Sequence, residues 1–262
     1  MIEIALFLAT GAIAGLSAGL LGIGGGLIIV PILFFIFNYQ NVPTGHVMHM
    51  ALATSLATIV VTSLSSARAH HKHGAVLWPT VFNLSPGILA GAWLGATFAS
   101  SLTSGILRPV FGLFELLVAV YLLVNYRPAT HSSSISRIKS ISGGIAIGSI
   151  SSIVGIGGGT LTVPFLLWHN VSIRNAVASS AACGFPIAVA GTAAYIVSGW
   201  NTAGLPAFTL GYVSLPAFAV IIITSIIAAP AGAALAHKLP EKTLRFFFAL
   251  FLLALGIRML LS

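Results

Sequence analysis

Long apolar segments separated by short polar gaps make up almost the whole chain. Ten such segments can be marked along the sequence: 4–21, 27–37, 46–67, 75–99, 105–124, 141–154, 160–168, 175–197, 207–236 and 244–261. A bilayer core about 30 Å thick needs roughly 20 apolar residues per helix, so three segments (27–37, 141–154 and 160–168) are too short to span it upright. The pattern predicts an all-α polytopic membrane protein.

Composition and charge exclude other classes of protein. Of 262 residues, 58% are hydrophobic and 5% are charged, whereas an average soluble domain is about a quarter charged. The net charge of +8 does not indicate a nucleic-acid binder, because the basic residues sit in the gaps between apolar segments. The single cysteine excludes a disulfide framework. With three Glu and no Asp, the chain lacks the paired acids of an enzyme, and we expect no catalytic residue, no cofactor and no metal.

Sequence motifs occur twice in the same order. Gly22–Gly26 (GIGGG) runs on to Val30-Pro31, and Gly155–Gly159 (GIGGG) runs on to Val163-Pro164, 133 residues later. Ala51–Ser55 (ALATS) resembles Ala176–Ser180 (AVASS). Internal repeats of this kind are typical of secondary transporters.

The repeats divide the chain into two halves. We expect a first transmembrane repeat over 1–125, a cytoplasmic linker over 126–140 that is rich in Ser and basic residues, and a second repeat over 141–262. Each half holds five elements, including a glycine-broken helix pair that is either re-entrant or discontinuous.

The basic residues favour one topology. If each glycine-centred pair (4–37 and 141–168) crosses the membrane once, the Lys and Arg divide six against five between the two sides. If each pair returns to its starting side, they divide nine against two, as the positive-inside rule expects. The second half is then an inverted repeat of the first, and both termini lie outside the cytoplasm.

The two glycine runs are the candidate binding site. Three contiguous glycines disfavour a regular helix, and freed backbone groups at membrane depth are tolerated only inside protein or against a water-filled cavity. The short segment after each run would point its N-terminal N–H groups back at the break, where they attract anions. We therefore predict an anion site at the repeat interface, formed by Gly24, Gly25, Gly26, Gly157, Gly158 and Gly159.

Other glycines are better explained by packing. Gly11 and Gly15, Gly91 and Gly95, and Gly144 and Gly148 are each spaced by four residues. Small residues at this spacing let two helices approach closely. Helix packing is also the alternative explanation for the two GIGGG runs.

The segments GIGGGLIIVP and GIGGGTLTVP, one in each half of an apolar chain, resemble the TauE/SafE family of membrane transporters, the sulfite exporters. The resemblance covers nearly the whole chain, and the family's glycine segments match Gly22–Gly26 and Gly155–Gly159. It implies a multi-pass transporter of the bacterial plasma membrane for a small sulfur-containing anion, such as sulfite or an organosulfonate.

Several polar residues are further candidates for the substrate site. Thr54 and Ser55, with their repeat equivalents Ser179 and Ser180, follow the glycine runs. Their hydroxyls can complete the anion's contacts, or can bond to a carbonyl of the preceding turn. Asn83, in an apolar stretch, is a candidate donor to substrate or to a neighbouring helix.

Charged residues are candidates for coupling or steering. Glu115 is the one acid well inside an apolar segment, where it can carry a proton or pair with Arg108. Arg174 can attract anions at the cytoplasmic mouth or anchor the topology. The histidines fall at 46 and 49 and in a basic loop at 70, 71 and 73, and we expect them to be solvated.

The sequence predicts alternating-access export of a small anion. A passive anion channel and an ion-coupled importer are the alternatives. The expected partners are the anion and the lipid bilayer, with no nucleic acid, and a homodimer is left open.

Overall fold

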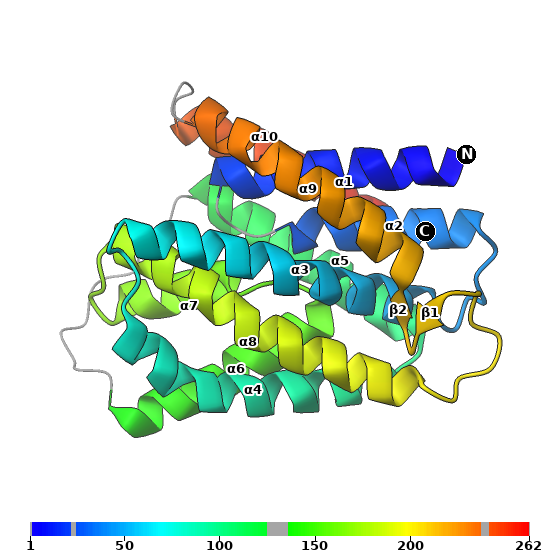
Figure 1. Ribbon diagram of the computed structural model, residues 1–262, viewed down its shortest axis with the longest axis horizontal. Coiled ribbons are helices and arrows are strands. Elements are labelled where there is room, and N and C mark those ends of the chain that lie inside the picture. Colours follow the sequence, from blue (N-terminus) through cyan, green and yellow to red (C-terminus); the bar gives the residue numbers. More distant parts are fainter. Residues whose placement is uncertain (1, 22–24, 125–135, 237–240, 262) are drawn as a thin grey trace.

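The computed structural model describes residues 2–21, 25–124, 136–236 and 241–261 of the chain. Within them the chain forms ten helices and one two-stranded hairpin (Figure 1). The helices are α1 (Ile2–Leu21), α2 (Gly26–Tyr39), α3 (Val47–Lys72), α4 (Trp78–Ser101), α5 (Ser104–Val124), α6 (Arg137–Val154), α7 (Gly159–Trp168), α8 (Ile173–Gly199), α9 (Leu215–Ala236) and α10 (Glu241–Leu261).

The all-α prediction is confirmed, with two local differences. The segment 207–236 was expected to be apolar helix throughout, but α9 begins only at Leu215. Before it, β1 (Thr209–Leu210) and β2 (Val213–Ser214) form an antiparallel hairpin, which Gly211 turns with a positive φ of 54°. The basic stretch expected as a loop is also different, because α3 continues to Lys72. Among the described residues, α3, α4, α5 and α8 are long and apolar enough to cross a membrane.

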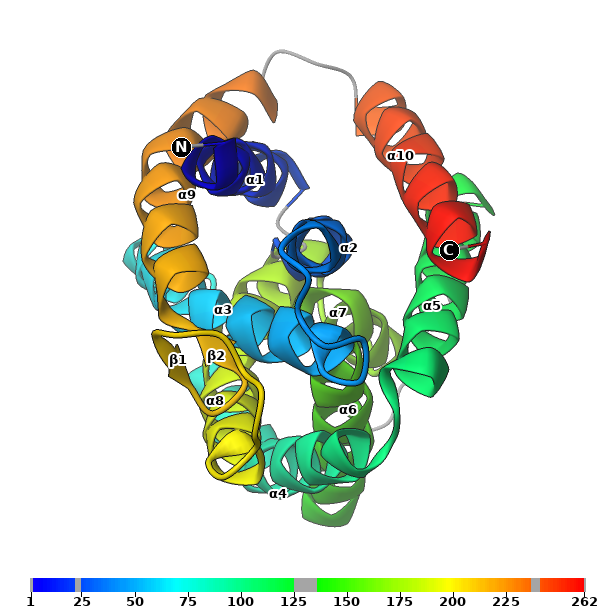
Figure 2. The ribbon, with the colours of Figure 1, turned by 90° about the vertical axis from the view of Figure 1, so that its right-hand side faces the viewer.

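The helices pack in extensive pairs around a centre. The chain pairs α1 with α9, α4 with α6, α3 with α8 and α5 with α10, and α4 also packs against α8. Figure 2 looks along the helices and shows α2 and α7 in the middle of the molecule, between the flanking α1–α9 and α5–α10 pairs. Helix α2 is therefore largely enclosed by the longer helices, whereas α7 is mostly half-buried, with Thr162 and Leu166 as its buried residues.

Close glycine contacts hold two of these pairs together. A Cβ added at Gly15 in α1 would lie 2.5 Å from the Ser225 carbonyl oxygen in α9, and one at Gly144 in α6 would lie 2.6 Å from the Leu84 carbonyl oxygen in α4. A side chain at either position would push the two backbones apart. The packing role predicted for the four-spaced glycines is confirmed at these positions.

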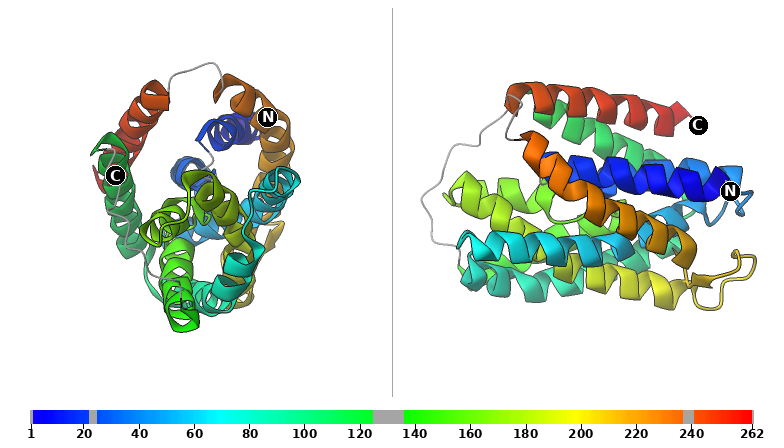
Figure 3. Two further views of the ribbon diagram at one scale, coloured as in Figure 1. Left: turned by 90° about the vertical axis from the view of Figure 1, so that its left-hand side faces the viewer. Right: turned by 45° about the horizontal axis from the view of Figure 1, so that its top comes forward.

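Both chain termini lie at the same end of the molecule (Figures 1 and 3). Arg108 and Arg258 lie toward this end, near the start of α5 and the end of α10. The opposite end carries seven basic residues of the described chain: Arg68, Lys72, Arg137, Lys139, Arg174, and, in the first turns of α10, Lys242 and Arg245. We call the latter the basic end. The described charges are thus concentrated at one end of the molecule, as the nine-against-two arrangement requires.

Candidate anion site

The second glycine run interrupts the helical structure. Helix α6 ends at Val154, and Gly155 follows in a left-handed conformation with φ of 71°. Gly155 to Gly158 are not helical, and α7 begins at Gly159. In the first run, Gly25 directly precedes α2, while Gly24 lies outside the described residues.

The two glycine runs meet backbone to backbone. A Cβ on Gly26 would lie 2.8 Å from the Gly155 carbonyl oxygen and 2.9 Å from the Ile156 Cα. The same carbonyl accepts a hydrogen bond from the Ser55 hydroxyl at 2.8 Å. We call this contact region, comprising Gly25, Gly26 and Gly155–Gly159, the glycine crossing. Only glycine allows two main chains to approach this closely.

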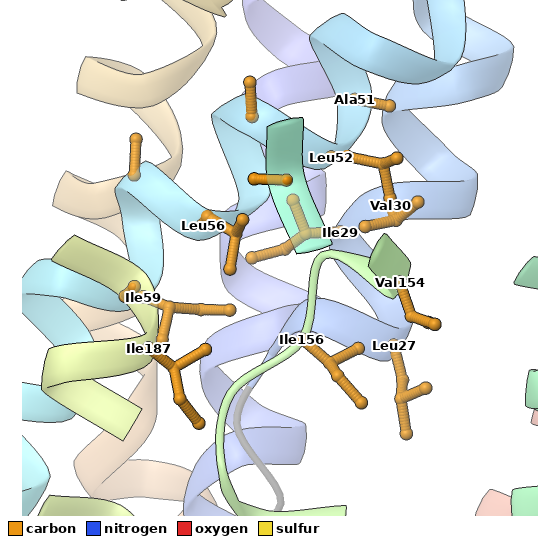
Figure 4. Close-up of a cluster of buried hydrophobic side chains, with 14 of the residues drawn as sticks. Leu27, Ile29, Val30, Ala51, Leu52, Leu56, Ile59, Val154, Ile156 and Ile187 are labelled. Atoms are coloured by element: carbon orange, nitrogen blue, oxygen red, sulfur yellow. The ribbon is translucent and has the colours of Figure 1, made fainter. Parts of the chain in front are cut away.

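Apolar side chains surround much of the crossing. Figure 4 shows Leu27 and Val30 of α2, Ile59 of α3 and Ile156 around the non-helical segment before α7. These residues are almost completely buried. Any polar group that contacts a substrate here must therefore come from the glycine backbone and the few hydroxyls beside it.

The first turn of α7 provides such groups. Gly158 precedes the helix without a side-chain cap, and the first intrahelical bond joins the Thr162 amide to the Gly158 carbonyl at 2.8 Å. The amides before it have no intrahelical partner. The Thr160 and Thr162 hydroxyls are buried and have no hydrogen-bond partner in the structure. A Cβ on Gly158 would lie 3.1 Å from the Thr162 Oγ1 atom, so this hydroxyl lies beside the uncapped turn.

Thr160 and Thr162 were not among the residues predicted for the site. Their signal was present, because two threonines directly follow the second GIGGG run. At the first run the corresponding residues are apolar, Leu27 and Ile29, and the N-terminus of α2 likewise lacks a side-chain cap. The two helix N-termini are therefore chemically unequal.

The predicted hydroxyls of α3 and α8 all have protein partners. The Thr54 Oγ1 atom accepts a hydrogen bond from the Ser214 amide, and the Ser179 Oγ atom accepts one from the Leu77 amide, each at 3.0 Å. These bonds tie α3 to the start of α9 and α8 to the start of α4. Ser180 donates to the Val177 carbonyl at 2.8 Å. Substrate binding by these residues stays a prediction.

Three other predicted residues lie away from the crossing or without the expected partner. Asn83 is exposed on α4, and the structure does not bring it to the crossing. Glu115 is fully buried in α5, with both carboxyl oxygens lacking a hydrogen-bond partner. Pairing with Arg108 was one of the two roles considered for Glu115, and the structure shows no hydrogen bond to either of its carboxyl oxygens. Arg174, exposed at the start of α8, donates from Nη2 to the His73 carbonyl at 3.2 Å.

The expectation that the histidines are solvated is wrong for His49, near the start of α3. His49 is buried rather than solvated, and its ring stacks on Tyr212 at a centroid distance of 5.0 Å. Its Nε2 atom lies 3.0 Å from the Leu102 carbonyl oxygen. Among the described residues, no three metal-binding side chains cluster together.

Comparison with known proteins identifies the family. The sequence profile described as "Sulfite exporter TauE/SafE" matches residues 7–259. The chain belongs to the TauE/SafE family. It is 40% identical over 260 residues to a probable membrane transporter protein of Haemophilus influenzae, covering 99% of this chain and 98% of that protein.

More distant TauE/SafE relatives have similar names. A probable membrane transporter protein of Methanocaldococcus jannaschii is 30% identical over 260 residues, covering 98% of this chain and 95% of the relative. No solved structure gives a significant match. The chain is a membrane transporter of this family, and the names of these relatives specify no substrate.

Proposed function

We propose that this transporter exports a small sulfur-containing anion, of the sulfite or organosulfonate class, and binds it at the glycine crossing. One observation carries the proposal: the Thr162 hydroxyl is fully buried without a partner, beside an uncapped helix N-terminus. Leaving a buried polar group unpaired costs about 1–3 kcal/mol. An anion that accepts from Thr160, Thr162 and the first amides of α7 would satisfy these donors together.

The proposal includes an inverted repeat. If α1–α5 correspond in order to α6–α10, then the α1–α9 pair corresponds to α6–α4, and the α3–α8 and α5–α10 pairs each correspond to themselves. These four pairs support the correspondence, although α4 packs more extensively against α8 than its counterpart α9 packs against α3. The bonds from the Ser214 amide to Thr54 and from the Leu77 amide to Ser179 are equivalent under the same correspondence. Alternating access would follow from one half rocking against the other around the crossing.

Export would draw on the membrane potential. We place the basic end in the cytoplasm of a bacterial cell, where the positive-inside rule puts it. Moving one negative charge out of an inside-negative cell gains about 2.3 kcal/mol per 100 mV, so a divalent anion gains about 4.6 kcal/mol. That gain sustains a concentration ratio of about three decades without a coupled ion.

Flux measurements in proteoliposomes test this proposal. Radiolabelled sulfite would be followed with and without an imposed potential, in competition with sulfate, thiosulfate, sulfoacetate and taurine. We expect saturable flux that rises with a potential driving the anion outward. Folded protein that shows no sulfite flux at any potential would rule out sulfite, and flux that does not saturate would indicate a channel.

Ion-coupled import is a second candidate, favoured by Glu115. A carboxyl group buried in a membrane-spanning helix without a partner is costly and is by default a candidate for function. Coupled import predicts that the anion flux moves protons with it. A pH indicator trapped inside the same proteoliposomes would detect that movement.

A further inference from the structure

Two histidines lie close together at the start of α3, at the end of the molecule that holds both termini. The ring centroids of His46 and His49 are 6.2 Å apart. This part of α3 packs beside the β1–β2 hairpin (Figures 1 and 2), and Tyr212 of the hairpin contacts both rings, at centroid distances of 5.9 and 5.0 Å. Among the residues that the structure describes, no third His, Cys, Asp or Glu joins the pair.

The pair presents ring nitrogens that the protein leaves unsatisfied. The Nε2 atom of His49 lies 3.0 Å from the Leu102 carbonyl oxygen, and it must carry the proton because a carbonyl only accepts. In a neutral imidazole the other nitrogen, Nδ1, then has a lone pair. The His49 side chain is 2% exposed, and its Nδ1 atom is buried without a partner. The Nδ1 atom of His46 is likewise buried without a partner.

We infer that His46 and His49 bind a Cu(I) ion through their Nδ1 atoms. A buried lone pair is satisfied by a donor or by a Lewis acid, and imidazole nitrogens are good ligands for copper and zinc ions. A metal–nitrogen bond of about 2 Å puts two imidazole centroids on one ion about 5 Å apart in a tetrahedral site and about 6 Å apart in a linear one. The observed 6.2 Å matches the linear arrangement.

The ligand set favours Cu(I) over Zn²⁺. Zn²⁺ in structural sites almost always has four ligands, whereas Cu(I) is stable with two in a linear arrangement. A monovalent ion also brings less charge into a site whose ligands are neutral, and buried charge without a counter-charge is costly. The buried Met50 lies four residues beyond His46, which is the spacing of neighbours on one helix face. Thioether ligands select Cu(I).

The surroundings of His49 hold its ring in the orientation that a metal ligand needs. A ligating histidine almost always donates its other ring N–H to a carboxylate, a backbone carbonyl or water, and the Leu102 carbonyl takes that role here. The His49 ring stacks on Tyr212 with an interplanar angle of 28°. The Tyr212 hydroxyl in turn accepts a hydrogen bond from the Thr202 hydroxyl at 3.3 Å. The ring is therefore fixed on both its edge and its face.

The backbone around His46 is fixed as well. The Ser104 hydroxyl donates to the Gly45 carbonyl at 2.8 Å and accepts from the Met48 amide at 3.3 Å. These two bonds hold the first turn of α3 against the start of α5. His46 itself is half-buried, so an ion can reach the pair from its side.

Cu(I) binding to the full chain tests the inference. The protein would be purified in detergent without a histidine tag, in a Cys183→Ala background that removes the chain's one thiol. Competition with a chromogenic Cu(I) chelator, without oxygen, measures stoichiometry and affinity. We expect one Cu(I) per chain. His46→Gln and His49→Gln should each weaken binding by more than the about 10–100-fold that loss of an outer-shell partner costs.

His46→Gln is the decisive variant, because the His46 Nδ1 atom has no protein hydrogen bond to lose. A melting temperature equal to that of the background protein shows that it is folded. Unchanged Cu(I) binding in this variant would overturn the inference, and would mean that water or a proton satisfies the two nitrogens. The X-ray absorption spectrum of the bound copper should show imidazole nitrogens, and a spectrum without them would also overturn the site.

Histidines at the other end of α3 provide the matched control. His70→Gln and His73→Gln remove imidazoles from the basic end and should leave Cu(I) binding unchanged. A loss equal to that of His46→Gln would overturn the assignment of the site, and displacement of Cu(I) by equimolar Zn²⁺ would overturn the choice of metal. None of these measurements involves sulfite, so the inference and the proposed function can fail independently.

Discussion

Replacing Gly26 by alanine is the sharpest test of the glycine crossing. The added Cβ would lie 2.8 Å from the Gly155 carbonyl oxygen and 2.9 Å from the Ile156 Cα, whereas ordinary van der Waals contact begins at 3.4 Å. Both obstructing atoms belong to the main chain, so no side-chain rotation relieves the overlap. The two backbones must separate by about 0.5 Å, and such overpacking costs typically about 1–3 kcal/mol.

Gly45→Ala provides the matched control for this change. A Cβ at Gly45 has no atom within 4 Å, and this glycine does not have a positive φ. Both substitutions reduce the conformational freedom of the unfolded chain by the same amount, about 0.4–1 kcal/mol. The difference between the two variants therefore isolates the cost of opening the crossing.

The assay combines thermal unfolding in detergent with sulfite flux in proteoliposomes. We expect Gly26→Ala to melt at a lower temperature than Gly45→Ala and to lose most of its flux. Gly45→Ala should melt at or slightly above the temperature of the unmodified protein and keep its flux. Equal melting temperatures and equal flux for the two variants would refute the tight contact and the binding site derived from it.

Three further substitutions test individual hydroxyl and carboxyl groups. Thr162→Val should raise the KM for sulfite about tenfold, which is the loss expected for a hydrogen bond to an anion. It should not lower the melting temperature, because the hydroxyl has no protein partner. An unchanged KM would remove Thr162 from the site. Ser179→Ala should destabilise the protein by about 1–3 kcal/mol because it strands the Leu77 amide, and a melting temperature equal to that of the unmodified protein would contradict that role. Glu115→Gln should keep sulfite flux, because potential-driven export needs no proton carrier; lost flux in folded protein would instead support coupling.

The helices could be predicted closely because the bilayer fixes the length of an apolar segment. The expected segment 105–124 is helix α5 almost to the residue, and 141–154 is the apolar part of α6. The predicted helix boundaries were wrong where a polar stretch is helical and where an apolar stretch is not helical. At Arg68–Lys72 the helix continues through basic residues, which are favoured at a helix C-terminus. The β1–β2 hairpin is built from Leu210, Tyr212 and Val213, so its composition resembles that of the helix that follows.

The site was less predictable because its contacts join distant parts of the chain. The glycine runs were visible as a repeat, but their contact depends on where the connection between α6 and α7 lies against the start of α2. The bond from the Ser214 amide to Thr54 spans 160 residues, and no local pattern in the sequence indicates it. The unpartnered hydroxyl of Thr162 likewise becomes apparent only when every surrounding donor and acceptor has been placed.

The distribution of charge suits a transporter in which only the form that holds the anion moves net charge across the membrane. A fixed cation at the glycine crossing would be costly in the bilayer interior, and it would move with an empty carrier as well as a loaded one. Helix N-termini and threonine hydroxyls attract an anion while leaving the empty site neutral. In the proposed export, the potential would then act on the anion itself and would contribute about 4.6 kcal/mol per 100 mV for a divalent anion. Arg174 fits this division, because it lies at the basic end, where a permanent charge can attract the substrate without crossing the membrane.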